Sequence, residues 1–162
     1  LCLLDLKKAF DKMNHCGLYI KLMNRLIPNA LLCVLEFWFN VCMTCVRWGN
    51  ALSNFIALEC GVRQGGVLSP YLFAIFIDDI INKIEQSSLG CKFKYKNVSI
   101  FIYADDIILL APSVESLQNM LQICEKELAW LDMSLNPKKS LCMRFGPRFN
   151  VNCSNICTIN GE

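Results

Sequence analysis

Two adjacent carboxylates stand inside a strongly apolar segment. Asp105 and Asp106 lie between the apolar runs 100–102 and 107–110. Burial costs each charge its solvation, and neighbouring carboxylates repel each other, so a bound divalent cation would be their strongest compensation. The flanking residues are β-branched or aromatic, which predicts two strands joined by a tight turn at residues 104–106. The pattern indicates a metal-binding hairpin, and the alternative is an ordinary surface turn, where Asp is common.

A third carboxylate has a similar setting. Asp5 ends the short strand-like run at residues 1–4. A sheet that paired this run with the hairpin would bring Asp5 beside the hairpin tip. Asp5 and Asp105 could then bridge two metal ions about 3.5–4 Å apart, the separation used in phosphoryl transfer.

Four segments, in order along the chain, resemble the sequence motifs of reverse transcriptases. They are DLKKAFD at 5–11, GVRQGGVLSPYLF at 61–73, YADD at 103–106 and LNPKKS at 135–140. Four motifs in this order are much more specific than any one of them. The first two most resemble those of non-LTR retrotransposons (long interspersed elements), and the maturases of group II introns are the close alternative.

The resemblance implies which residues bind the metal ions. Asp5, Asp105 and Asp106 would be the catalytic carboxylates and would hold two Mg²⁺ ions, for which Mn²⁺ can substitute. The backbone carbonyl of Leu6 would be a further ligand. One ion would activate the primer 3′-hydroxyl and the other would neutralise the triphosphate. Asp106 has an alternative role, which is to orient the hairpin or approach the primer end.

The resemblance also implies a set of nucleotide-binding residues. Phe10 would lie under the incoming sugar and leave no room for a 2′-hydroxyl. Gln64 and Gly65 would form a loop that approaches the base pair closely, since glycine lets the backbone come near. Lys139 would face the departing pyrophosphate. The structural alternatives are a core aromatic for Phe10, an ordinary turn for the glycine loop and a solvated surface lysine for Lys139.

The order of the elements predicts an α+β fold. We interpret residues 1–162 as a partial reverse transcriptase domain. It would be a polymerase palm, with an antiparallel sheet that carries the catalytic hairpin and packs on helices, together with part of the fingers. The N-terminal fingers and the thumb would be absent. The expected helices are 15–27, 30–40, 69–86 and one capped by Ser113, and the expected strands are 1–4, 43–48, 52–59, 93–95, 98–103, 107–111 and 141–145.

Composition and charge limit the classes of partner that the chain is expected to have. The net charge of +2 is only weak support for nucleic-acid binding. Lys92, Lys94 and Lys96 alternate along one expected strand and would share a face, as a phosphate track or as solvated surface. The resemblance implies an RNA template, a DNA primer, deoxynucleoside triphosphates and the missing fingers and thumb as partners. No apolar run reaches the roughly 20 residues that cross a bilayer, so we expect no membrane partner.

The 11 cysteines are scattered along the chain, which favours a reducing intracellular compartment, nucleus or cytoplasm. Cys42 and Cys45 have metal-site spacing, and Cys153 and Cys157 form a looser pair. A four-thiolate zinc site is conceivable, but buried free thiols are the default interpretation. The single histidine, His15, is expected to start a helix rather than to act as a base.

Two other classes of function fit the same motifs. The first is a non-catalytic RNA-binding or maturase-like module that keeps the fold, against which the presence of all three aspartates argues. The second is an inert remnant of a retroelement. With 54% apolar residues and no clamp for the primer and template, we expect the isolated chain to be inactive and prone to aggregation.

Overall fold

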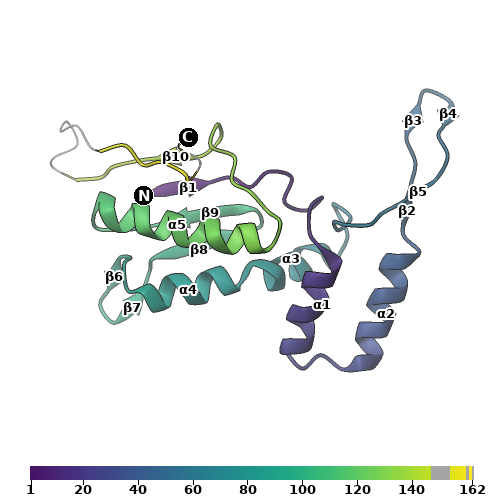
Figure 1. The fold of residues 1–162 in the computed structure, drawn as a ribbon, viewed down its shortest axis with the longest axis horizontal. Helices are drawn as coiled ribbons and strands as arrows, with labels where there is room; N and C mark the ends of the chain where they lie inside the picture. The colour runs from purple at the N-terminus through teal and green to yellow at the C-terminus, as the bar shows by residue number, and fades with distance from the viewer. Residues whose placement is uncertain (147–153, 160, 162) are drawn as a thin grey trace. The chain divides into compact units, whose positions relative to one another are not determined.

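The computed structural model describes residues 1–146, 154–159 and 161 (Figure 1). Residues group into two compact units. The first unit contains residues 1–9 and 77–162, and the second contains residues 10–76. Each unit has its own buried apolar side chains, so each is described by itself.

The first unit is built on a four-stranded antiparallel sheet. Its strand order is β10-β1-β9-β8, so two chain-distant strands lie next to each other at its centre (Figure 1). The strands are β1 (Cys2–Leu4), β8 (Ile100–Tyr103), β9 (Asp106–Leu109) and β10 (Leu141–Cys142). This confirms an α+β arrangement with an antiparallel hairpin in the sheet.

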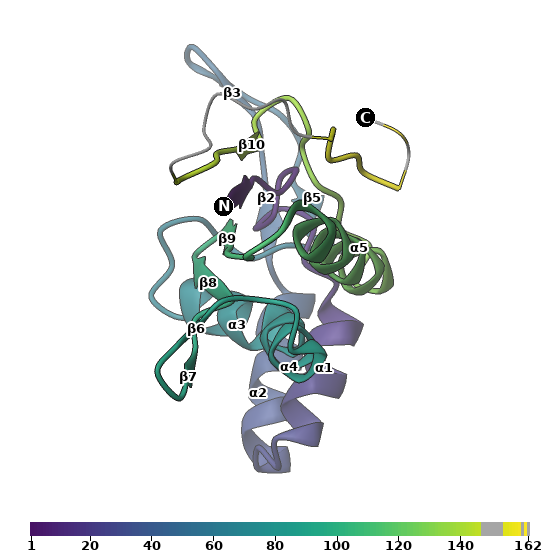
Figure 2. The same cartoon turned by 90° about the vertical axis from the view of Figure 1, so that its left-hand side faces the viewer.

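Helices cover one face of this sheet. Helices α4 (Asp79–Ser87) and α5 (Val114–Trp130) lie side by side on the same side of the strands (Figure 2). Leu4 and Ile107 are paired and point to the helices, so both are buried. The alternate positions face the other way, and Tyr103 on that face is 84% exposed. The sheet therefore has one packed face and one open face.

Helix α5 shows how local sequence sets this packing. Ser113 accepts a hydrogen bond from the Ser116 amide at 3.1 Å and caps the helix, as its residue type predicts. The buried side chains recur at helical spacing and form one stripe toward the sheet, as expected. They are Leu117, Met120, Leu121, Cys124 and Leu128.

The second unit combines three helices with two short β-ribbons. Helices α1 and α2 pack against each other, and Phe39 of α2 is buried. The ribbon β3–β4 turns at Gly49-Asn50, as expected for this turn pair. The elements are α1 (His15–Asn24), α2 (Asn29–Asn40), α3 (Ser69–Ile77), β2 (Met43–Thr44), β3 (Arg47–Trp48), β4 (Ala51–Leu52) and β5 (Ile56–Ala57), with β2 paired to β5.

The expected helix at residues 69–86 is two helices. Helix α3 ends at Ile77 and α4 begins at Asp79, with Asp78 as a turn between them. The carbonyl of Asp78 accepts from the amides of Ile81 and Asn82, which starts a new helical turn. Asp78 itself keeps a helical backbone, with φ −66° and ψ −21°, and its side chain makes no capping hydrogen bond. The interruption is therefore confined to this one residue.

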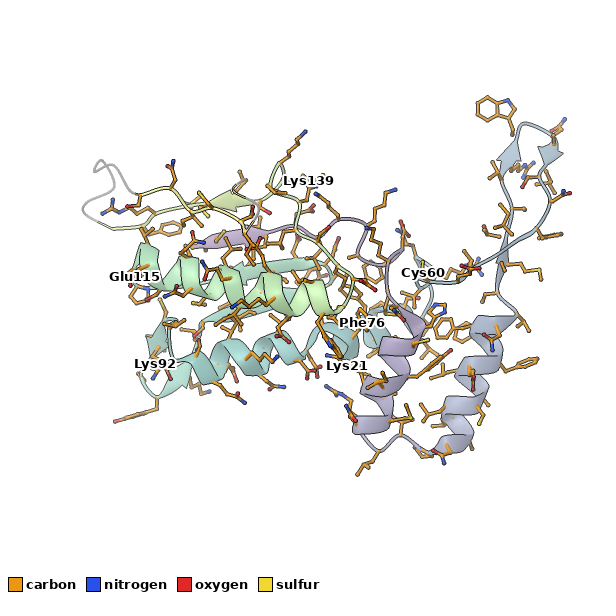
Figure 3. All side chains as sticks on the ribbon, viewed as in Figure 1. Lys21, Cys60, Phe76, Lys92, Glu115 and Lys139 are labelled. Carbon is orange, nitrogen blue, oxygen red and sulfur yellow. The ribbon has the colours of Figure 1, made fainter. Side chains whose placement is uncertain are left out.

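The expected strand pairing around residues 96–97 is wrong. Strands β6 (Lys92–Phe93) and β7 (Lys96–Asn97) form their own hairpin, and the turn lies at Lys94-Tyr95 with a φ of +56° at Lys94. Phe93 pairs with Lys96, and Lys92 pairs with Asn97. Lys92, labelled in Figure 3, and Lys96 therefore lie on opposite faces of the hairpin, so these lysines do not form a one-sided track.

The cysteines depart from the expectation of buried thiols. Among the described cysteines, all are free and only Cys2 and Cys124 are buried. Cys42 and Cys45 are half-buried, and Cys153 lies outside the described residues. Within the described residues no three His, Cys, Asp or Glu side chains are placed to hold one metal ion.

Many large apolar side chains are exposed in this chain. Trp48 on the β3–β4 ribbon is 86% exposed, and Phe37 on α2 is 69% exposed. In the described part of the chain no helix combines the length and the apolarity that crossing a bilayer requires.

Candidate active site

The carboxylate pair lies at the tip of the β8–β9 hairpin. Tyr103 pairs with Asp106, which leaves Ala104 and Asp105 as a two-residue turn. Ala104 has a φ of +52°, which such tight hairpin turns require at their first position. Asp105 is therefore in the turn, whereas Asp106 is the first residue of β9. The predicted hairpin is confirmed, with a turn one residue shorter than expected.

The sheet brings Asp5 beside this tip. Strand β1 pairs with β9 in an antiparallel register in which Leu4 faces Ile107. One further step in this register places Asp5 across from Asp106. Directly opposed residues point to the same face, so both carboxylates belong to the open face of the sheet. The structure thus pairs the first and third motifs, with Asp106 rather than Asp105 directly across from Asp5.

Asn136 of the fourth motif holds Asp5 in place. Its side-chain Nδ2 donates to Asp5 Oδ2 at 3.0 Å, and its backbone N–H donates to the Asp5 carbonyl at 2.8 Å. The Asp5 N–H donates to Ser140 Oγ at 3.2 Å, and that hydroxyl donates to the Asn136 carbonyl at 2.9 Å. The three residues form a closed hydrogen-bond network that fixes the backbone and one oxygen of Asp5.

Asn136 and Ser140 belong to the fourth motif, but the sequence alone predicted no function for them. The available signal was the pair Asn136-Pro137, which favours a turn directly after an apolar residue. That signal predicts a turn, but it does not predict a partner in the first motif.

The backbone pairing around Leu6 leaves its carbonyl oxygen available as a hydrogen-bond acceptor or ligand. Leu6 forms an isolated antiparallel bridge with Leu135. The bridging bonds come from its neighbours, because Lys7 N–H donates to Ser134 O at 2.9 Å and Asn136 N–H donates to Asp5 O. In the described part of the chain no hydrogen bond reaches the Leu6 carbonyl. The side chain is buried while this backbone oxygen keeps its acceptor capacity.

The second unit holds Phe10 and Gln64 together. The Val62 N–H donates to the Phe10 carbonyl at 2.8 Å, and the Phe10 ring stacks on Phe73 with centroids 4.7 Å apart. Gln64 Nε2 donates to Asp11 Oδ1 at 3.3 Å. The end of the first motif and the start of the second are therefore adjacent, and Phe73 fixes one face of the Phe10 ring.

Two glycines make this junction. Gly61 has a φ of +83°, and a Cβ there would lie 2.7 Å from the Asp11 carbonyl oxygen. Gly65 has a φ of +78° in a turn closed by a 3.0 Å bond from the Gly66 N–H to the Arg63 carbonyl. No atom lies within 4 Å of a Cβ built on Gly65, so this turn has open space beside it. The sequence alone did not predict that Gly61 allows this close approach to the carbonyls of Phe10 and Asp11.

Lys139 and His15 have simpler surroundings. Lys139 is exposed on the turn before β10 (Figure 3), and its backbone N–H donates to the Asn136 carbonyl at 3.1 Å. His15 is the first residue of α1, its Nε2 lies 2.7 Å from the Gly61 carbonyl, and its ring stacks on Phe39. These contacts agree with the predicted helix-start role of His15.

The expected site residues thus fall into two groups. The carboxylate group belongs to the first unit and is organised by the sheet and Asn136. The nucleotide group belongs to the second unit and is organised by the loop that contains Gly61. The carboxylate group consists of Asp5, Leu6, Asp105, Asp106 and Lys139, and the other group consists of Phe10, Gln64 and Gly65.

The donors of the first group have the chemistry that Mg²⁺ prefers. Carboxylate oxygens and a free backbone carbonyl are hard ligands. A site with few protein ligands is usual for Mg²⁺, which keeps waters and binds one or two carboxylates together with substrate phosphates. The group therefore offers hard oxygen donors of the kind that Mg²⁺ binds, but no three described acidic, histidine or cysteine side chains are placed to hold one ion.

An antiparallel sheet with carboxylates at one strand end and at the adjacent hairpin tip defines a candidate metal-dependent nucleotidyl-transfer site. The chain belongs to the reverse transcriptase family, because the family model described as "Reverse transcriptase (RNA-dependent DNA polymerase)" matches residues 1–152. This confirms the resemblance drawn from the four motifs.

Similar proteins indicate which group of reverse transcriptases the chain resembles most. The chain is 31% identical over 167 residues to the RNA-directed DNA polymerase from mobile element jockey of Drosophila funebris, covering 99% of this chain and 18% of that protein. It is 27% identical over 139 residues to a Pol polyprotein from the type-1 retrotransposable element R2 of Nasonia vitripennis, covering 86% of this chain and 14% of the relative. These similarities support a non-LTR retrotransposon origin over an intron maturase. The chain spans less than a fifth of the length of these relatives.

Proposed function

We propose that this chain is the palm, with part of the fingers, of an RNA-directed DNA polymerase encoded by a non-LTR retrotransposon. The first unit corresponds to the palm in this proposal, and the helices and ribbons of the second unit include the finger part. The RNA template, the DNA primer and deoxynucleoside triphosphates are the proposed substrates. Further segments of a longer protein would complete the grip on the primer and template.

One observation carries the proposal. Strand β1 pairs with β9 up to Leu4 and Ile107, so the next residue, Asp5, lies beside the hairpin tip, and the Asn136 side chain donates to its carboxylate. The hydrogen bonds among Asp5, Asn136 and Ser140 restrict the orientation of the Asp5 carboxylate before any ligand binds. Preorganised carboxylates are what metal-assisted nucleotidyl transfer requires.

Each residue of the carboxylate group has a role in this proposal. Asp5 and Asp105 hold the divalent ions, with the Leu6 carbonyl as an added ligand. Asp106 either binds the same ions or aligns the primer end. The ions, when bound, supply Lewis-acid activation of the 3′-hydroxyl and neutralise charge on the phosphates. The ammonium group of Lys139, which is exposed, donates positive charge to the leaving pyrophosphate.

The residues of the second group choose the nucleotide. Phe10, backed by Phe73, presents one ring face to the sugar and excludes a 2′-hydroxyl. Gln64 and the turn at Gly65 contact the nucleotide or template through an amide and a bare backbone. Two observations support these roles. The residues match the motifs of the family, and there is open space beside Gly65.

The decisive experiment removes the metal-binding charge without changing shape. In a full-length protein that contains this chain, Asp5→Asn and Asp105→Asn should each reduce Mg²⁺-dependent primer extension on an RNA template to background. Circular dichroism and the thermal midpoint should stay close to wild type, because Asn keeps the size of Asp.

Asp132→Asn is the matched control. Asp132 is exposed and has a φ of +57°, a conformation that Asn tolerates well. This variant should extend primers at the wild-type rate. Near-normal extension by Asp5→Asn or Asp105→Asn would remove that residue from catalysis. An inactive wild-type protein that still binds the primer and template would support a non-catalytic or inert copy instead.

A further inference from the structure

We propose that Cys2 and Cys142 are a redox-active cross-strand pair, a site at which oxidation joins strands β1 and β10 by a disulfide. The two residues face each other in the β1–β10 register, and their Sγ atoms lie 2.8 Å apart as hydrogen-bonded thiols. This proposal does not depend on polymerase activity.

The backbone register allows this bond without rearrangement. The Leu1 nitrogen donates to the Met143 carbonyl at 2.9 Å, and the Met143 N–H donates to the Leu1 carbonyl at 2.8 Å. Leu1 and Met143 are therefore the hydrogen-bonded pair, and Cys2 and Cys142 form the next, non-hydrogen-bonded pair. In such pairs the Cα atoms are about 4.5 Å apart, within the range of about 4.4–6.8 Å that a disulfide spans.

The two thiols differ in access and in reactivity. Cys142 is exposed, whereas Cys2 is 2% exposed in the core beneath the sheet. The hydrogen bond with Cys2 lowers the pKa of Cys142 to about 7, although partial burial acts in the opposite direction. The pKa of Cys2 is raised by the same bond and by burial. Cys142 is therefore the thiol that meets an oxidant first, since the thiolate is the attacking form.

The reaction proceeds by ordinary thiol–disulfide exchange with oxidised glutathione as the oxidant. The Cys142 thiolate attacks one glutathione sulfur, forms a mixed disulfide and releases one glutathione thiolate. Cys2 then loses its thiol proton, and its sulfur attacks the Cys142 sulfur and releases the second glutathione. Two protein thiols are oxidised to one disulfide, and one oxidised glutathione is reduced to two thiols.

Oxidation of Cys2 and Cys142 should affect the nearby hydrogen-bond network of Asp5. Strand β1 leads directly into Asp5, and β10 follows the turn that contains Asn136 and Ser140. A bond between β1 and β10 therefore closes the end of the sheet next to the Asp5 network. Oxidation should protect the Asn136 amide, which donates to the Asp5 carbonyl, from hydrogen exchange.

The test equilibrates the native chain with a series of reduced and oxidised glutathione mixtures. After acid quenching and alkylation, non-reducing digestion and mass spectrometry identify the linked peptides. We expect the Cys2–Cys142 link to exceed any other cysteine link by at least about tenfold, and this excess to disappear in urea, because it depends on folded proximity. The intact mass should show the loss of two thiol hydrogens.

The controls separate this pair from general cysteine oxidation. Cys33→Ser changes an exposed thiol on α2 and should leave the Cys2–Cys142 link unchanged. Cys2→Ala should convert Cys142 into a lasting glutathione adduct. The proposal is overturned if the wild-type chain accumulates that adduct without the Cys2–Cys142 link. It is also overturned if the links are distributed equally among the cysteines under native conditions.

Discussion

Asn136 binds Asp5 twice, with its side-chain amide on the carboxylate at 3.0 Å and with its backbone N–H on the carbonyl at 2.8 Å. The two residues are far apart in the chain and belong to the fourth and first motifs. The double contact restricts both the backbone and the χ angles of Asp5. It thereby links the turn before β10 to the carboxylate that we assign to the metal ions.

Replacing Asn136 by Ala should lower activity without abolishing it. The carboxylate of Asp5 would remain but would lose its orienting amide, and loss of such supporting contacts typically costs about 10–100-fold. In the full-length protein, the rate of primer extension should fall by that factor and should recover in part at higher Mg²⁺ concentration. Asn82→Ala, at an exposed position of α4, is the matched control and should change neither quantity. Wild-type Mg²⁺ dependence in Asn136→Ala would show that the contact is only structural.

Shortening Phe10 should relax the choice of sugar. A 2′-hydroxyl placed against the ring would be desolvated without a partner, and Phe10→Val would open that space. The ratio of kcat/KM for deoxynucleotides to that for ribonucleotides should fall at least roughly tenfold, about 1.4 kcal/mol of differential transition-state binding.

Phe55→Val, an exposed aromatic of the same unit, should leave the nucleotide ratio unchanged. An active Phe10→Val enzyme with the wild-type ratio would make Phe10 a packing residue of the Phe73 stack and nothing more.

Gly61→Ala should destabilise the second unit. The position has a φ of +83°, and the added Cβ would lie 2.7 Å from the Asp11 carbonyl oxygen and 2.8 Å from that of Phe10. Left-handed strain of about 1–2 kcal/mol is therefore joined by a backbone clash. Urea denaturation should show a loss of about 2–4 kcal/mol in the free energy of unfolding.

Gly49→Ala is the matched comparison, because Gly49 also has a positive φ but no atom within 4 Å of the new Cβ. It should cost only the strain of about 1–2 kcal/mol. Equal losses in the two variants would mean that the loop around Gly61 shifts without cost.

The reactivity of Cys142 should depend on pH near neutrality. Its pKa is lowered to about 7 by the hydrogen bond with Cys2, so the alkylation rate should rise through that pH and level off above it. Peptide mass spectrometry after timed iodoacetamide treatment measures this rate for each cysteine. Cys2→Ala removes the bond that favours the thiolate, so the midpoint of the Cys142 profile should move to higher pH. If the midpoint of the Cys142 profile is unchanged in Cys2→Ala, the low pKa of Cys142 has another cause than the bond with Cys2.

The sequence by itself determined the local parts of this protein. The hairpin at 103–106 follows from β-branched runs on both sides of a tight turn, and α5 follows from Ser113 and its apolar stripe. These elements are encoded by neighbours in the chain, so propensity and periodicity suffice. The same reasoning failed at 92–97, because strands of two residues carry almost no periodic signal. It also failed at Asp78, where a single residue divides the expected helix into α3 and α4.

Only the tertiary structure decided which distant residues meet. The β1–β9 register brings Asp5 beside the hairpin tip, since a shift of β1 by one residue would turn Leu4 away from the core. The same packing brings Asn136 to Asp5 and Cys142 to Cys2. None of these contacts is encoded by spacing along the chain. They arise because burial of one sheet face against α4 and α5 allows a single alignment of the strands.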